Sequence, residues 1–559
     1  MRKIKWKRSA VLGVALMVTS AFVWSPVGNN RAADDDLFEI RKNTEIFFDV
    51  YKYVDAMYVD EPSPGNLMKV GIDAMLQSLD PYTVYIPESR IEDYRFMTTG
   101  QYGGVGALIR EKENFVIISE LYEGFPAQKA GLIPGDVLLE IDGKSLEGKT
   151  SEEVSELLKG QAGTPLKLKY RRYGNVEEAE LSREEVKIPD VPYSGMVEDK
   201  TGYIKLNSFT QTAHKDVDAA FRELKDEGME RLILDLRGNG GGLLIEAVKI
   251  VNMFVEKGKP VVEMRGRMEE MNRTYKTEMQ PVDTEIPVVV LIDEGSASAS
   301  EIVAGALQDL DRAVVIGNTS FGKGLVQQTH DLKYNGKIKI TIAKYYTPSG
   351  RCIQKLDYSH KNADGSVEEV PDSLVTNFYT GNGRIVKDGR GIDPDVFVDN
   401  KELSPIGRAL LQEGIFFEFA NQFYREHESI APASEFLISD DLYAQFTDFA
   451  IQREFDYRTA STEGLERWKE LAKNERYFEL AKEEYEALLK KITPDPKEDL
   501  KRFREQLEMF LLNEIISRYY YEKGQFESSF IADDDLLKAR EILSDSNTYN
   551  SILDGTFQP

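Results

Sequence analysis

The sequence predicts a mixed α/β and α+β protein built from several domains. Its 559 residues are too many for a single hydrophobic core, and 41% of them are hydrophobic, which is enough for several. Apolar residues recur at helical spacing near both ends of the chain, whereas the middle alternates short β-rich runs with glycine turns and helices. We therefore expect a helical region at residues 35–99, a β-rich domain at 100–186, an α/β core at 187–402 and a helical region at 403–559.

The N-terminal helical region should contain two amphipathic helices. Apolar residues recur every three or four positions from Phe38 to Val54. A break at Pro62–Gly65 then leads to a second helix at 67–79, which Asp80 and Pro81 should end.

The two middle domains should differ in how their strands are connected. The β-rich domain is expected to have strands at 115–118 and 137–141 and a short helix at 151–158. In the core, helical segments separate the strands expected at 203–206, 232–236, 288–292 and 314–316, a pattern typical of an α/β sheet.

Beyond residue 403 the pattern is helical. Two apolar stripes, separated by a turn at Pro494 and Pro496, are predicted to be helix-packing faces. Their members are Phe478, Ala481, Tyr485 and Leu488 in the first stripe, and Phe503, Leu507, Leu511 and Ile515 in the second.

Residues 1–30 predict export from the cytoplasm. Five basic residues within the first eight positions precede an uncharged apolar stretch from Ser9 to Trp24. No small-x-small cleavage site stands before Arg31, so the segment is either a cleaved signal peptide or an uncleaved anchor in the inner membrane. We expect a periplasmic or otherwise extracytoplasmic protein.

Charge and cysteine content exclude several classes of function. The formal net charge of −26 repels phosphate backbones, so no nucleic-acid partner is expected. The single cysteine, Cys352, rules out an intrachain disulfide and a cysteine-based zinc site, and it is expected to be a small buried side chain. No metal or organic cofactor is predicted.

A serine cluster supplies candidate nucleophiles. Residues 295–301 read GSASASE, follow the apolar run 288–292 and precede a helical pattern. Unsatisfied amides and the helix dipole at a helix start favour negative charge, so this turn could present a hydroxyl and stabilise an oxyanion. The alternative is that Ser296, Ser298 and Ser300 only cap the helix.

Lys323 is a candidate base. It lies in SFGKGLVQ (320–327), which we expect to be a loop entering a strand, so that Lys323 and Gln327 point the same way. A lysine amine can accept a proton near neutral pH when burial lowers its pKa, and the amide oxygen of Gln327 could hold it. The alternative is a surface lysine beside an ordinary strand residue.

A glycine-rich turn at residues 235–242 (DLRGNGGG) follows the strand expected at 232–236. Glycines allow close backbone approach and expose N–H groups, as an oxyanion hole requires. The spacing fits a dinucleotide-binding loop poorly, and a plain tight turn is the alternative. The four histidines, at positions 214, 330, 360 and 427, are scattered and match no hydrolase or zinc-protease motif, although a triad does not need neighbours in sequence.

Five strings together resemble the carboxy-terminal processing peptidases, also called tail-specific proteases. They are LDLRGNGGGLL (234–244), GSASASE (295–301), SFGKGLVQ (320–327), KYYTPSGRCIQ (344–354) and GIDPDV (391–396). In that family the nucleophile stands 25 residues before the lysine and the glutamine four after it, which selects Ser298, Lys323 and Gln327. The resemblance further implies an oxyanion hole from the amides of Gly241 and Ala299, and a spiral α/β core like that of crotonases and Clp proteases. This chain departs from the family next to Gly241, because it has Asn239–Gly240 where the family often has Asn-Pro.

Residues 100–186 resemble a PDZ domain. The string GGVGALI (103–109) matches the loop that receives a terminal carboxylate, and PAQKAGL (126–132) matches a later turn. The resemblance implies that Gly104, Val105, Gly106, Ala107 and Leu108 bind a free protein tail, which adds as a β-strand with its carboxylate on the loop amides. A glycine-rich hairpin without a ligand is the alternative.

The sequence thus predicts a serine endopeptidase that acts through an acyl-enzyme on proteins or peptides with free carboxyl tails. A noncatalytic PDZ scaffold or chaperone is the main alternative, but it leaves the Ser298, Lys323 and Gln327 spacing unexplained. An acyl-CoA enzyme is a third reading, but no basic CoA-phosphate site or pair of catalytic carboxylates supports it. A homo-oligomer or a regulatory partner is compatible with the sequence, which assigns no role to residues 403–559.

Overall fold

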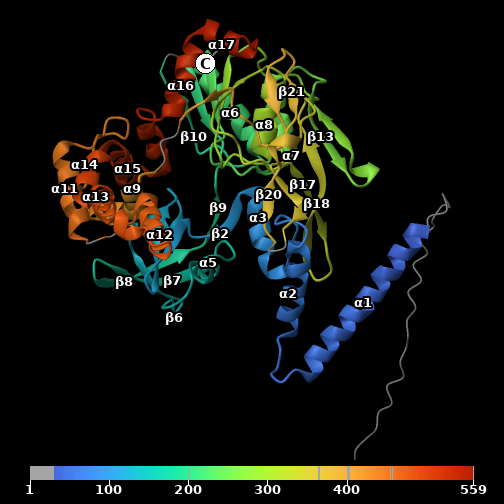
Figure 1. Cartoon of the computed structure of the whole chain (residues 1–559), viewed down its shortest axis with the longest axis horizontal. Helices are drawn as coiled ribbons and strands as arrows, with labels where there is room; N and C mark the ends of the chain where they lie inside the picture. Colours follow the sequence, from blue (N-terminus) through green and yellow to red (C-terminus); the bar gives the residue numbers. More distant parts are fainter. Residues whose placement is uncertain are drawn as a thin grey trace, which may run out of the picture. The chain divides into compact units, whose positions relative to one another are not determined.

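The computed structural model describes residues 31–198, 200–362, 365–399, 403–453, 455 and 457–557. The predicted export segment at 1–30 lies outside the described residues. The chain divides into two compact units, Met1–Met75 and Leu76–Pro559 (Figure 1). Across the described residues, no helix combines the length and the apolarity needed to cross a membrane.

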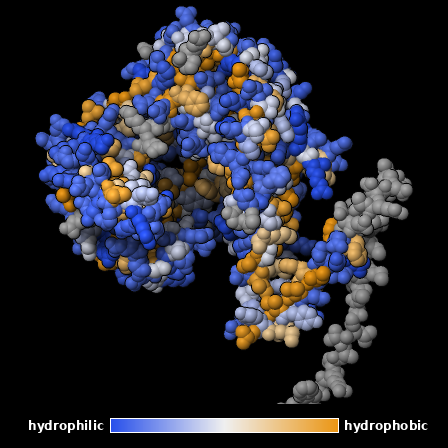
Figure 2. All heavy atoms as spheres, viewed as in Figure 1, coloured by the Kyte–Doolittle hydropathy of each residue, from blue (hydrophilic) through white to orange (hydrophobic). Residues whose placement is uncertain are grey.

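Two helices form the described part of the first unit. Helix α1 (Arg31–Met57) and helix α2 (Pro64–Gln77), whose last turn enters the second unit, confirm the two predicted helices. Helix α2 begins at Pro64, within the predicted break, because proline is well accommodated at the first position of a helix. Much of their apolar surface is exposed: Phe38, Ile40 and Phe48 are each more than 60% accessible. Figure 2 shows hydrophobic side chains gathered over α2 and the adjoining end of α1.

The expectation of an entirely helical region before residue 100 is wrong at one point. Strand β1 (Val84–Ile86) lies between α2 and helix α3 (Ile91–Thr99) and pairs antiparallel with β18 (Lys337–Tyr346). Three residues are too few to show a strand period in sequence, because only the partner strand, about 250 positions later in the chain, holds them extended.

The β-rich domain forms one antiparallel sheet with the strand order β3-β4-β5-β7-β8. Its elements are β3 (Ala107–Lys112), β4 (Phe115–Leu121), β5 (Val137–Ile141), β6 (Lys144–Ser145), β7 (Pro165–Arg172), β8 (Asn175–Ser182), α4 (Pro126–Lys129) and α5 (Ser151–Leu158). The predicted strand at 137–141 and helix at 151–158 are confirmed. At the ends of the domain, β2 (Gln101–Gly104) pairs with β9 (Glu184–Lys187).

The core sheet has the order β10-β11-β12-β15-β16-β23, and all neighbours are parallel except β10 and β11. Its strands are β10 (Tyr193–Met196), β11 (Thr201–Lys205), β12 (Arg231–Asp235), β15 (Val288–Ile292), β16 (Val314–Gly317) and β23 (Val396–Phe397). Because β12 and β15 are parallel neighbours, the glycine-rich turn and the serine turn leave the sheet at the same edge.

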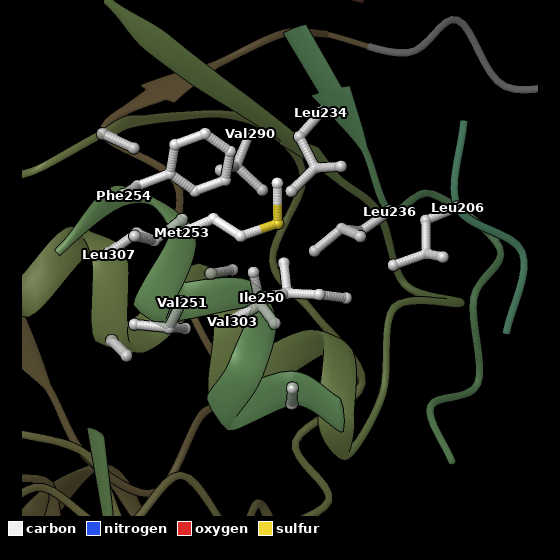
Figure 3. Close-up of a cluster of buried hydrophobic side chains, with 14 of the residues drawn as sticks. Leu206, Leu234, Leu236, Ile250, Val251, Met253, Phe254, Val290, Val303 and Leu307 are labelled. Carbon is white, nitrogen blue, oxygen red and sulfur yellow. The ribbon is translucent and has the colours of Figure 1, made fainter. Parts of the chain in front are cut away.

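Helices cover one face of this sheet. They are α6 (Ala213–Asp226), α7 (Leu244–Phe254) and α8 (Ala299–Asp309). Figure 3 shows Ile250 and Met253 of α7 and Leu307 of α8 among the strand residues Leu234 and Val290, and all five are at most 1% exposed. This packing fixes the start of α8 against the end of β15.

A second, antiparallel sheet lies beside the core. It has the order β1-β18-β13-β14, and β17 also pairs with β18. Its other strands are β13 (Pro260–Gly266), β14 (Arg273–Lys276) and β17 (Leu325–Asp331). Outside this sheet, β19 (Leu356–Lys361) pairs with β20 (Val367–Glu369), and β21 (Asn377–Tyr379) pairs with β22 (Ile385–Lys387).

The C-terminal region is helical, as predicted, but its helices belong to three clusters. Helices α9, α10, α11, α14 and α15 pack around a core that includes Phe416, Phe446 and the predicted stripe Leu507, Leu511 and Ile515. Helices α12 and α13 form a smaller cluster with Ala472 and Tyr485. The bounds of these helices are α9 (Pro405–Gln412), α10 (Ile415–Glu426), α11 (Asp440–Gln452), α12 (Ala460–Asn474), α13 (Lys482–Ile492), α14 (Pro496–Arg502) and α15 (Arg504–Ser529). The other stripe is not one helix face, because a 3₁₀ turn at Phe478–Leu480 precedes α13 and Leu488 is 46% exposed.

The last two helices, α16 (Asp534–Ser544) and α17 (Ser546–Leu553), instead cover the other face of the core sheet (Figure 1, red). Leu536 and Ile542 are buried with Val289 and Leu291 of β15. The hydroxyl of Tyr549 hydrogen bonds to both the amide (3.0 Å) and the carbonyl (3.1 Å) of Val288. The end of the chain is therefore part of the core.

Candidate active site

Ser298 occupies a strained turn between β15 and α8. It is the N-cap of α8, with φ 57° and ψ −109°. A non-glycine residue in such a region costs on the order of 1–3 kcal/mol and persists only where its surroundings impose it. Here the packing of α7 and α8 on the sheet holds both ends of the turn.

The three serines of the cluster differ in what their hydroxyls do. Ser296 and Ser300 are fully buried, and their hydroxyls donate to the carbonyls of Leu236 (2.9 Å) and Asn239 (2.8 Å). Ser298 is partly exposed, and its hydroxyl donates no hydrogen bond to the described residues. Structural roles therefore account for two of the serines and leave Ser298 as the one available for chemistry.

Lys323 lies in the loop before β17 rather than in the strand. The strand begins at Leu325, and the pairing of β17 with β18 shifts register between Val326 and Gln327. Strand alternation therefore does not relate Lys323 to Gln327. The Lys323 amine lies 4.2 Å from the ring centre of Tyr82, and the Gln327 amide nitrogen donates to the Thr341 hydroxyl at 3.2 Å. Among the described residues, no hydrogen bond joins the Lys323 amine to Ser298 or Gln327.

The environment of Lys323 favours the neutral amine. Burial lowers its pKa to about 8, and the positive charge of Lys339 acts in the same direction. The carboxylates of Glu301 and Asp80 oppose the shift. A substantial fraction of this amine is therefore unprotonated at mildly alkaline pH and can accept a proton.

Glu301 joins the serine turn to the lysine loop. It is fully buried, and one of its oxygens, Oε2, accepts hydrogen bonds from the amides of Ser298 (2.7 Å) and Lys323 (2.9 Å). The two amide nitrogens are therefore no farther apart than the sum of these distances. The other oxygen accepts from the Ser320 hydroxyl (2.6 Å) and the Gly322 amide (2.7 Å). Burial raises the pKa of Glu301, whereas these four hydrogen bonds favour its ionised form.

The glycine-rich turn packs directly against the turn that contains Ser298. Gly241 has φ +98°, and a Cβ added there would lie 2.6 Å from the Ala297 carbonyl oxygen and 2.9 Å from Ser298 Cβ. Only glycine fits this position. The Gly241 amide donates to Asn239 Oδ1 at 2.9 Å, whereas the Ala299 amide donates to no described residue. The two predicted oxyanion donors therefore lie beside Ser298, but only the Ala299 amide is free.

Two histidines and the single cysteine are other side chains that could act as a base or a nucleophile. His214 is partly buried beside Glu246 and Asp218, and His360 is paired with Asp357. Burial raises the pKa of Cys352, which favours its unreactive thiol form.

A second candidate site is a groove of about 510 Å³ between β3 and α5. The predicted residues Gly104, Val105, Ala107 and Leu108 line it, with Ser155 and Leu158 of α5 opposite. Strand β3 pairs with β4 on one side, and no strand of the described chain pairs with its other edge. A peptide could therefore add along that edge.

The loop at the end of this groove has free backbone donors. The amides of Val105 and Gly106 donate to no described residue, whereas the carbonyls of the same two residues accept from the amides of Ala127 (2.8 Å) and Tyr122 (3.0 Å). Gly106 is outside the groove lining but shapes the loop: its φ is +74°, and a Cβ there would lie 2.3 Å from Phe125 Cβ.

Sequence reasoning assigned no role to two residues of the serine site. Glu301 stands three positions after Ser298, the spacing of a helix capping box, and this signal could have found it. Tyr82, which faces the Lys323 amine, stands 241 positions earlier in the chain and carries no such signal.

Comparison with known proteins identifies a serine-type peptidase that carries a PDZ domain. Family models match three parts of the chain: peptidase family S41 at residues 200–359, the PDZ domain at 117–172, and the C-terminal helical domain of probable PDZ-proteases at 406–543. A carboxy-terminal-processing protease of Bartonella bacilliformis is 38% identical over 314 residues, which are 55% of this chain and 72% of the relative.

The chain belongs to the carboxy-terminal-processing proteases of peptidase family S41. It is also similar to a probable CtpA-like serine protease of Staphylococcus aureus, at 34% identity over 54% of this chain and 61% of the relative. A solved photosystem II D1 C-terminal processing protease is 28% identical over 64% of this chain and 94% of its own, with a TM-score of 0.35. The predicted mixed fold class, with helical regions flanking a PDZ domain and a protease core, is confirmed.

Proposed function

We propose that this protein is an endopeptidase that uses Ser298 as nucleophile and Lys323 as general base. The Ser298 oxygen attacks the scissile carbonyl carbon as Lys323 takes its proton, and the C–N bond then breaks as Lys323 returns the proton to the leaving amine. Water next hydrolyses the Ser298 ester and releases the acid product. The lowered pKa of Lys323, in a loop that Glu301 holds to the serine turn, carries this assignment.

The Ala299 amide is the main proposed oxyanion donor. It stands at the first position of α8, where the helix dipole favours negative charge. The Gly241 amide would contribute after exchanging its present acceptor, Asn239 Oδ1, for the oxyanion. Gln327 uses its amide nitrogen on Thr341, so its oxygen remains available to accept a hydrogen bond from the Lys323 ammonium.

The PDZ domain is proposed to select substrates by their free carboxyl tails. An open β3 edge supports strand addition, and the free amides of Val105 and Gly106 suit a terminal carboxylate. Apolar atoms of Val105, Leu108 and Leu158 in the groove favour an apolar last residue. The substrates are therefore proteins or peptides with free apolar tails.

The site of action is proposed to lie outside the cytoplasm. The basic and then apolar order of residues 1–30 supports export, either with cleavage of this segment or with its retention as a membrane anchor.

A matched pair of peptides tests the proposal. One ends in a free apolar carboxyl residue and the other in the same residue amidated, which removes the charge that the loop amides would bind. The wild-type enzyme should cleave the free acid faster below saturation, and Ser298→Ala should cleave neither. Equal cleavage of both peptides would overturn tail recognition, whereas full activity of Ser298→Ala would overturn the nucleophile and favour a different catalytic site.

A further inference from the structure

Arg237 is held from two sides beside the catalytic turn. It stands two residues after the end of β12, and its side chain forms an ion pair with Asp235, the last residue of that strand (2.6 Å). On the other side, its guanidinium donates to both oxygens of Asp533, at 2.9 Å and 2.7 Å, and to Asp535 at 2.9 Å. Two parallel hydrogen bonds to one carboxylate fix both the position and the plane of a guanidinium. The side chains are largely buried: Arg237 is 19% exposed, Asp533 16% and Asp535 4%.

The two aspartates come from the far end of the chain. Asp533 is the N-cap of α16 and Asp535 lies in its first turn, about 300 residues after Arg237. Helix α16 is itself fixed on the core sheet by Leu536, Ala539 and Ile542, all at most 1% exposed. The carboxylates are therefore mounted on a rigid part of the core.

The segment that follows Arg237 is tied at several points to the serine turn. The Gly238 amide donates to Asp293 Oδ1 (2.8 Å), and the Asn239 carbonyl accepts from the Ala297 amide (3.0 Å) and the Ser300 hydroxyl (2.8 Å). Gly241 ends the segment in contact with Ser298. A displacement of Arg237 therefore moves the backbone that packs on the nucleophile.

We infer that Asp533 and Asp535 are positioning residues for catalysis, which act through Arg237 to hold the segment 237–241 against Ser298. The inference rests on the proposed Ser298 mechanism and adds a role for the C-terminal helices. Through Arg237, the C-terminal helices fix the segment 237–241 beside Ser298. Without the end of the chain, this segment of the protease core would lose its fixed position. Binding of substrate remote from this loop is not affected.

Asparagine variants test the inference with a control on the same helix. Asp533→Asn and Asp535→Asn keep shape and polarity, and asparagine at 533 still caps α16. Asp534 is exposed and makes no contact with Arg237, so Asp534→Asn is the matched loss of one charge. We expect kcat for peptide hydrolysis to fall by about ten- to a hundredfold in the 533 and 535 variants, with KM unchanged, as for small displacements of catalytic groups. Asp534→Asn should match the wild type.

A double-mutant cycle separates positioning from stability. If Asp533 acts through Arg237, adding Asp533→Asn to Arg237→Gln should lower kcat no further, because the first change already frees the loop. All variants are assayed well below their unfolding temperatures, measured in parallel. Wild-type kcat in both aspartate variants, or additive losses in the cycle, would overturn the inference. Such a result, with Ser298→Ala still inactive, would leave the proposed mechanism intact.

Discussion

Replacing Lys323 by methionine should inactivate the enzyme and stabilise its fold at the same time. Methionine has a similar length but no charge to bury. The amine is largely buried against Tyr82, and burial lowers its pKa from the ordinary 10.5 to about 8. The wild-type protein therefore bears a cost for keeping a protonated amine in this place at neutral pH.

The size of the gain follows from that difference in pKa. Each pKa unit corresponds to about 1.4 kcal/mol, so a pKa lowered from 10.5 to about 8 means that the buried charge costs about 3.5 kcal/mol at pH 7. Loss of the cation–π contact with Tyr82 offsets about 0.5–1 kcal/mol of the gain. We expect Lys323→Met to raise the free energy of unfolding by about 2.5–3 kcal/mol at pH 7.

The sign of the pH dependence is fixed by the depressed pKa. Below pH 8 the amine is protonated in both states and the folded state bears the whole cost. Between pH 8 and 10.5 the folded state loses its proton first, so the cost fades and the advantage of the variant shrinks. Urea unfolding at pH 7 and pH 10 measures this change, with the exposed Lys333→Met as control. Two results would refute the reasoning: a variant that is less stable than wild type at pH 7, or a variant whose gain in unfolding free energy over wild type is the same at both pH values.

Three further predictions concern other parts of the two sites. Ser296→Ala and Ser300→Ala should retain catalysis but lose about 1–3 kcal/mol of stability, since each removes a buried hydrogen bond. Denaturant unfolding measures the loss, and variants that are inactive but fully stable would contradict the prediction. Gly241→Ala should abolish hydrolysis while leaving tail binding unchanged, because the added Cβ would collide with the turn that contains Ser298. A turnover assay measures hydrolysis, and calorimetric titration with a tail peptide measures binding. Ser155→Trp should fill the PDZ groove and remove any preference for a free over an amidated tail, and a preserved preference would place tail recognition elsewhere.

Motif spacing gave a more specific prediction of the candidate site than local periodicity did. The distance from Ser298 to Lys323 selected one serine of three, and the hydrogen bonds of Ser296 and Ser300 agree with that choice. Strand alternation does not apply to Lys323 and Gln327, because the strand starts two residues after the lysine and has a register shift before the glutamine, so their common direction stays a prediction. Such irregularities depend on the neighbouring strand, which local sequence does not reveal.

Contacts between distant segments could not be predicted from the sequence, because they depend on partners that local sequence does not reveal. The helical pattern expected beyond residue 403 covers α16 and α17, but their burial on the core sheet depends on partners such as Val289 and Leu291, more than 200 residues away. In the sequence, Asp533 and Asp535 belong to a run of three aspartates that matches no motif. Only the folded chain brings them to Arg237.

The pH-dependent labelling of Ser298 by a fluorophosphonate tests the central claim most directly. The reagent requires an activated serine and no bound substrate, so its rate reports the Ser298–Lys323 pair alone. We predict that mass spectrometry will find the label on Ser298, that the rate will rise with a midpoint near pH 8 as Lys323 loses its proton, and that Lys323→Met will be labelled far more slowly. A label on another residue, or an unchanged rate in Lys323→Met, would contradict the account.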